Sequence, residues 1–140
     1  MPRADGAAPG RHPLGQFALF EFKTGHLMTT DLKTRLTEIN KQFGALGQAQ
    51  PAAMSAFQGV MKAATQDGSL PAAVKELVAV ALAVQKGCDD CVLFHTSQAL
   101  RHRATREQLA EVLAINIEMG GGPGAMYASK ALAYFDALNA

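Results

Sequence analysis

The sequence lacks tryptophan, long apolar segments and blocks of like charge, and it contains only two cysteines. Aromatic residues make up 6% of its 140 residues, whereas 49% are hydrophobic, and alanine is the commonest of these. Few aromatic and many alanine residues disfavour a β-sandwich or a barrel and favour packed helices. A chain of this length is expected to form one domain with a core of its own.

The absence of charge blocks and long apolar runs also narrows the range of partners. A formal net charge of +1 argues against a nucleic-acid partner or an anionic membrane surface. The longest apolar run, Leu77–Val84, has eight residues, whereas a membrane span needs roughly 20. No apolar leader is apparent near the start, because proline and glycine interrupt it. We therefore expect a cytoplasmic protein, in which close cysteines indicate redox chemistry, catalysis or metal binding.

The chain divides into two parts by composition. Residues 1–27 are rich in glycine, proline and arginine at first and are expected to be a disordered or arm-like extension, with a short strand or arm at residues 16–23. Residues 28–140 are expected to form the domain. From Asp31 onward the spacing of apolar residues predicts only helices, about six in number.

Start and stop signals give the expected bounds of these helices. Thr30 or Asp31 is expected to begin the first, and Gly44 and Gly47 to end it. The second begins near Pro51 and presents one apolar face. The third spans residues 71–86 and is expected to be hidden on most sides, the fourth spans residues 88–102, and Thr105 opens the fifth with a capping box. The glycine-rich residues 120–124 separate the fifth helix from the sixth.

The chemistry of the sequence is concentrated in GCDDCVLFH, residues 87–95. Cys88, Cys91 and His95 stand at positions i, i+3 and i+7, which places them on one face of a helix. A helix N-terminus stabilises a thiolate, and a histidine one turn beyond can accept its proton. This spacing is compatible with a redox pair, with part of a metal site, or with two small packed residues.

The helical hairpin predicted at Gly87 adds a fourth residue. Glu76 lies eleven residues before the turn and His95 eight after it, an offset of about 4.5 Å along the helix axis. A carboxylate beside an apolar run needs a partner, and His95 is the nearest candidate. The residues therefore predict a relay in which Glu76 orients His95 and His95 draws a proton from Cys91.

The spacing of these four residues resembles the core motif of the AhpD-like alkylhydroperoxidases, in the carboxymuconolactone decarboxylase superfamily. The motif reads Glu76, eleven residues, Cys88-x-x-Cys91, three residues and His95. The flanks KELVAVALAVQKGCDDC and HRATREQLAEVLAINIEMGGGPGAMYA are similar to the helices around that motif. The resemblance covers roughly residues 30–138. It implies an all-α, AhpD-like helical bundle that assembles as a homo-trimer or homo-hexamer.

The resemblance also implies a function: a thiol-dependent peroxidase or disulfide oxidoreductase with catalytic residues Cys91, Cys88, His95 and Glu76. Cys91 would attack a small-molecule hydroperoxide, and Cys88 would resolve the product as a disulfide. A dithiol reductant such as lipoamide, or a partner peroxiredoxin, would then reduce that disulfide. No cofactor and no bound metal are implied.

One pair of residues departs from the best-known pattern of that family. A histidine stands between the cysteines there, whereas this chain has Asp89 and Asp90. Negative charge beside a thiolate raises the thiol pKa and opposes the effect of the helix terminus. We therefore expect either that the aspartates weaken the peroxidase reaction or that the preferred substrate is another disulfide or a different electrophile.

Two other functions remain as alternatives. The first is a decarboxylase-like enzyme acting on a cyclic lactone acid, although such relatives generally lack the paired cysteines. The second is a non-enzymatic or zinc-binding oligomeric subunit. Cys88, Cys91 and His95 are acceptable zinc ligands, but no fourth ligand is near, because His102 lies roughly 10 Å further along the helix.

Overall fold

The computed structural model describes residues 25–140, with side chains described from Asp31 onward. Every regular element within these residues is a helix: α1 (Gly25–Ala49), α2 (Pro51–Thr65), α3 (Ala72–Lys86), α4 (Asp89–Arg101) and α5 (Arg106–Asn139). The predicted all-α class is confirmed. The predicted N-terminal extension, with its short strand or arm, lies outside the described residues except for its last three positions.

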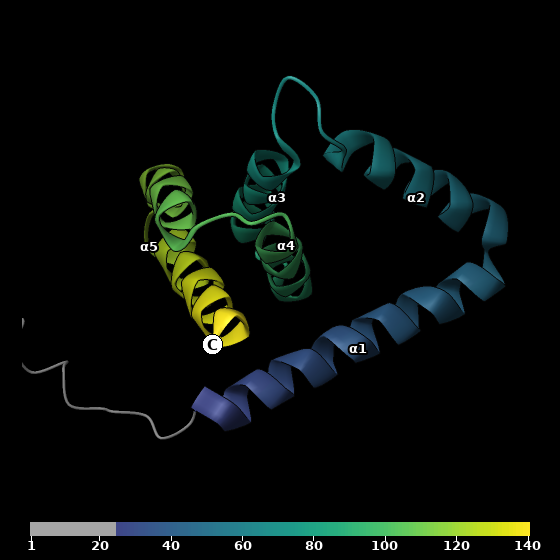
Figure 1. Cartoon of the computed structure of the whole chain (residues 1–140), viewed down its shortest axis with the longest axis horizontal. Coiled ribbons are helices and arrows are strands. Elements are labelled where there is room, and N and C mark those ends of the chain that lie inside the picture. The colour runs from purple at the N-terminus through teal and green to yellow at the C-terminus, as the bar shows by residue number, and fades with distance from the viewer. Residues whose placement is uncertain (1–24) are drawn as a thin grey trace, which may run out of the picture.

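Helices α3, α4 and α5 pack around the main hydrophobic core (Figure 1). Val80 of α3, Val92 of α4 and Phe135 of α5 expose 2% of their surface or less. The apolar run of α3 is helical, as its alanine content predicts, but it is not hidden on most sides. Val78 and Leu82 remain 47% and 58% exposed, because no helix among the described residues covers that face of α3.

The turn between α3 and α4 is a tight helical hairpin. Gly87 adopts the left-handed conformation, with φ 65°, which a residue with a Cβ adopts only at a cost. Its N–H donates to the Val84 carbonyl, and the N–H of Cys88 donates to the Ala83 carbonyl, each at 3.1 Å. These two bonds form a Schellman motif, which ends α3. The chain reverses at Gly87 and Cys88, and α4 begins at the next residue.

Helix α5 contains the predicted glycine break as a kink rather than as a loop. Gly121 has φ 55° and ψ −142° inside the helix, two residues before Pro123. The expected sixth helix is therefore the part of α5 that follows this kink. Gly124 lies so close to Asn116 that an added Cβ would sit 2.5 Å from its carbonyl oxygen. This close approach lets the two parts of α5 pack without a connecting loop.

Helix α1 extends beyond both of its predicted ends. It begins at Gly25 and continues through Gly44 and Gly47 to Ala49, so the expected cap and the expected stop were wrong. Neither glycine has positive φ, and an ordinary helical glycine only weakens a helix. Helix α1 is attached through a small second cluster in which Leu32 and Ile39 lie with Leu93 of α4.

Helices α1 and α2 form an arm that extends away from the α3–α5 bundle (Figure 1). The predicted apolar face of α2 is only partly covered: Met54 is buried, but Phe57 is 47% and Val60 66% exposed. Of the helices in the described region, none is both long enough and apolar enough to cross a membrane.

Candidate active site

The two cysteines lie where α4 begins. Cys88 is the N-cap residue, and Cys91 lies in the first turn. They form a disulfide, with Cα atoms 5.2 Å apart, which is an ordinary separation for a bridged pair. The Cys91 residue is exposed, whereas Cys88 is half-buried. Of the two residues, Cys91 is therefore the more exposed to solvent.

The predicted contact between Glu76 and His95 is present. The Nδ1 atom of His95 lies 2.8 Å from Oε2 of Glu76. Glu76 is only 3% exposed on α3, so its carboxylate needs a hydrogen-bond donor, and the imidazole supplies one. A histidine that donates through Nδ1 leaves Nε2 free to accept a proton. The hairpin at Gly87 thus converts a separation of 19 residues into a direct contact.

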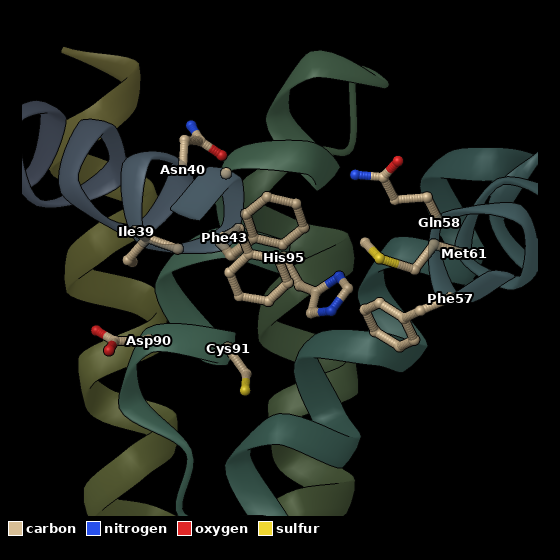
Figure 2. A pocket seen from close by; sticks show the side chains of 11 residues that line it. Ile39, Asn40, Phe43, Phe57, Gln58, Met61, Asp90, Cys91 and His95 are labelled. Atoms are coloured by element: carbon tan, nitrogen blue, oxygen red, sulfur yellow. The ribbon is translucent and has the colours of Figure 1, made fainter. Parts of the chain in front are cut away.

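Cys91 and His95 open onto a pocket of about 410 Å³ between the arm and the bundle. Figure 2 shows Cys91 and His95 near the aromatic and apolar side chains of this pocket. Its wall combines residues of α1, α2 and α4: Ile39, Asn40, Phe43, Gly44, Phe57, Gln58, Met61, Asp90, Cys91, Phe94 and His95. The sequence placed the cysteines on one face of α4 but did not reveal that α1 and α2 build the opposite wall.

Asp89 and Asp90 are not the isolated negative charges that the sequence suggests. The Arg35 guanidinium of α1 donates to both: its Nη2 lies 2.9 Å from Asp89 Oδ2, and its Nε lies 2.9 Å from Asp90 Oδ1. From α5, the Tyr134 hydroxyl donates to Asp89 at 3.1 Å, and Lys130 Nζ lies 3.4 Å from the same carboxylate.

This network lowers the pKa of Asp89. Partial burial raises that pKa, but the hydrogen bonds from Arg35 and Tyr134 outweigh it and hold the pKa below its ordinary value. Burial, together with the Asp89 carboxylate, raises the pKa of Tyr134. The negative charge of the aspartates is thus partly offset, because α1 and α5 each supply a cation. Their effect on the peroxidase reaction stays a prediction.

Sequence analysis missed Arg35, Tyr134 and Lys130. Arg35 is 54 residues from Asp89 and 55 from Asp90, and no local spacing rule reaches that far. The only signal was indirect: Arg35 adjoins Leu36 on the apolar stripe of α1, and it precedes Ile39 by one turn.

The zinc alternative finds no support in the geometry. No group of three or more histidine, cysteine, aspartate or glutamate side chains within the described residues is arranged to hold a metal ion. His102 is the C-cap of α4, at the opposite end of that helix from Cys88. The imidazole of His95 is instead held by Glu76.

Three comparisons with known proteins found similar proteins. Residues 51–134 match the model of the carboxymuconolactone decarboxylase family. A protein of Cupriavidus necator, described as uncharacterized, is 98% identical over 113 residues, which cover 81% of this chain and 100% of that protein. A Paracoccus denitrificans protein, described as uncharacterized protein 4 in the cox locus, is 36% identical over 102 residues. That match covers 71% of this chain and 92% of the other.

A solved structure is also similar. It is the apo form of a carboxymuconolactone decarboxylase family protein from Legionella pneumophila, with 38% identity and a TM-score of 0.75. The match covers 79% of this chain and 98% of that one. The likeness extends over most of both chains, so it concerns the whole helical arrangement.

Proposed function

This chain belongs to the carboxymuconolactone decarboxylase family, and from that premise we propose that it is a thiol oxidoreductase that reduces hydroperoxides through Cys91 and Cys88. The observation that carries the proposal is that His95, which lines the same pocket as Cys91, is held by Glu76. A cysteine, a base and a residue that orients the base are the parts of an activated nucleophile.

The exposure of the two cysteines supports their division of roles. Cys91 lines the pocket and is exposed, whereas Cys88 is half-buried at the N-cap. A thiolate that attacks peroxide needs access and a positive local field. Cys91, in the first turn of α4, has access and the field of the helix N-terminus. Cys88 is bonded to Cys91 in this structure, which supports a role in resolving the oxidised product.

The proposed reaction has two steps, after which a reductant returns the disulfide to two thiols. His95 accepts the proton of Cys91, and the thiolate attacks the terminal oxygen of ROOH. The O–O bond breaks, Cys91 becomes a sulfenic acid, and the alkoxide takes a proton to leave as ROH. The Cys88 thiol then attacks the sulfenic sulfur, which gives the disulfide and water. A dithiol reductant such as dihydrolipoamide, or a partner peroxiredoxin, restores both thiols by exchange.

The pocket disfavours the decarboxylase alternative. A lactone acid carries negative carboxylates, which need cationic or well-placed donor groups when they leave water. Among the described residues, the pocket wall is mostly apolar, contains neither lysine nor arginine, and carries the Asp90 carboxylate. A neutral peroxide with an apolar substituent fits these surroundings better than an acid does.

Assembly with further copies of the chain forms part of the proposal, as a homo-trimer or homo-hexamer. Half-exposed apolar side chains lie on α3 and α5, among them Leu82, Ile115 and Met119 at 58%, 59% and 74% exposure. Exposed apolar residues of this kind mark association surfaces when they form a contiguous patch. Sedimentation at several concentrations measures the number of copies.

The test is peroxide consumption with dihydrolipoamide as reductant. Wild-type protein should consume an organic hydroperoxide catalytically, and Cys91→Ser should be inactive. Cys88→Ser should reduce about one peroxide per subunit and then stop, since its sulfenic acid cannot be resolved. If stoichiometric peroxide consumed neither thiol of the reduced wild type, the proposed function would be wrong.

A further inference from the structure

Arg35 joins the arm to the two residues that separate the cysteines. Its Nη2 donates to both Asp89 and Asp90, and its Nε donates to Asp90 as well. Its Nη1 donates to the Tyr134 hydroxyl at 3.3 Å. The Arg35 side chain is about one-third exposed. A guanidinium that binds two carboxylates and a hydroxyl has a fixed position, because the fork of its donors is rigid.

The charges near the cysteines balance only when Arg35 is counted. Asp89 and Asp90 contribute two negative charges in the first turn of α4, where a thiolate would add a third. Arg35 and Lys130 contribute two positive charges. Without Arg35, a thiolate would form beside two carboxylates, with Lys130 near Asp89 as the remaining cation. Nearby like charge disfavours the ionised form.

The other groups around Cys91 do not substitute for Arg35. On the pocket wall, α1 contributes Ile39, Asn40, Phe43 and Gly44, and α2 contributes Phe57, Gln58 and Met61, none of which is charged. Behind the wall, Glu76 of α3 carries a charge, but it is bound to His95. The Tyr134 hydroxyl donates a hydrogen bond to Asp89 and carries no charge at neutral pH.

We propose that Arg35 is a positioning residue of the redox site, which offsets the charge of Asp89 and Asp90 and thereby favours the Cys91 thiolate over the thiol. The inference rests on the proposed function in one respect, that Cys91 is the reacting cysteine. It goes beyond that function because it assigns control of the reactivity to a residue on another helix. The same contact ties α1, which supplies part of the pocket wall, to the start of α4.

The experiment measures how the reactivity of Cys91 depends on pH. In a Cys88→Ser background, reduced protein is treated with iodoacetamide across a pH series, so that only Cys91 is alkylated. Arg35→Gln should move the midpoint of the rate profile to higher pH, because the thiolate then forms beside unbalanced carboxylates. In protein with both cysteines, Arg35→Gln should lower the equilibrium constant for reduction of the disulfide by glutathione about three- to tenfold. A tenfold change corresponds to about 30 mV in reduction potential.

Matched variants separate charge from structure. Arg35→Lys keeps the charge and should retain most of the wild-type midpoint. Adding Asp89→Asn and Asp90→Asn to Arg35→Gln should return the midpoint toward wild type, because the unbalanced carboxylates are gone. Arg106→Gln breaks a two-bond arginine–aspartate pair on α5 and should leave the midpoint unchanged.

An unchanged midpoint in folded Arg35→Gln protein would overturn the inference. If Arg35→Gln does not fold, Asp89→Asn with Asp90→Asn tests the same balance from the opposite side. That variant leaves Arg35 unopposed and should move the midpoint to lower pH, and a midpoint that stayed in place would overturn the inference equally. If the wild type does not react with peroxide but the variants show these shifts of the midpoint, the result would contradict the proposed peroxidase reaction and support the role of Arg35.

Discussion

The α3–α5 bundle and the α1–α2 arm are both helical, but they are held in different ways. The bundle buries a continuous core in which Val80, Leu109 and Phe135 are almost fully covered. The arm contacts the rest of the chain through a small cluster around Leu32 and Ile39 and through the Arg35 ion pairs. The difference indicates that the bundle carries most of the stability, while the arm completes the pocket at Cys91.

The largest expected effect comes from removing a core aromatic side chain. Phe135→Ala should lower the free energy of unfolding by about 3–5 kcal/mol, because it leaves a cavity in a closely packed core. Urea denaturation followed by circular dichroism measures it. A loss below about 1 kcal/mol would show that the core of the bundle is not where the stability resides.

The next largest effect concerns the relay that faces the arm across the pocket. His95→Gln should slow the reaction of peroxide with Cys91 about 100-fold or more, since general-base catalysis typically contributes 10²–10⁴-fold. Stopped-flow measurement of thiol loss gives the rate. Glu76→Gln keeps the shape of the side chain and should slow the same step less. Unaltered rates in both variants would contradict the relay.

A smaller effect is expected at the junction of arm and bundle as the solution is acidified. The folded-state pKa of Asp89 is lowered from its ordinary value of 3.8. Its contacts are therefore fully stabilising above that pH, and their contribution is lost as the pH falls from about 3.8 toward the lower folded-state pKa. Asp89→Asn should flatten this acid limb of stability. If the free energy of unfolding fell equally steeply below pH 4 in Asp89→Asn and in wild type, Asp89 would not contribute to the acid limb.

The smallest effect on stability is expected in the arm. Phe57→Ala makes the same chemical change as Phe135→Ala but at a side chain that is 47% exposed. Its free energy of unfolding should change by less than about 1 kcal/mol, because much of the ring already contacts water. The KM for a bulky organic hydroperoxide should rise a few-fold, since Phe57 lines the pocket. A stability loss equal to that of Phe135→Ala would remove the distinction between the two regions.

Sequence reasoning worked where the signals are local. Gly87 predicted the turn, Thr105 with Gln108 predicted the capping box that is present at α5, and the helix offset predicted the contact of Glu76 with His95. Each follows from spacing along one helix or across one hairpin, which backbone geometry determines.

The same reasoning failed where tertiary contacts decide. Gly44 and Gly47 were expected to end α1, yet a helix tolerates glycine at a moderate cost. The apolar face of α2 was predicted, but a sequence pattern does not tell which neighbour covers that face. Arg35 lies more than fifty residues from its aspartates, and a single arginine on an amphipathic helix carries no mark of its partner.

The hairpin at Gly87 has a consequence for how the protein folds. All four proposed catalytic residues, from Glu76 to His95, lie in two consecutive helices or at the two-residue turn, Gly87 and Cys88, that joins them. Contacts between residues so close in the chain require little loop-closure entropy and form rapidly. We therefore expect the relay to assemble early, before the arm docks. A nascent chain would then carry its reactive cysteines in place while the pocket around them is still open.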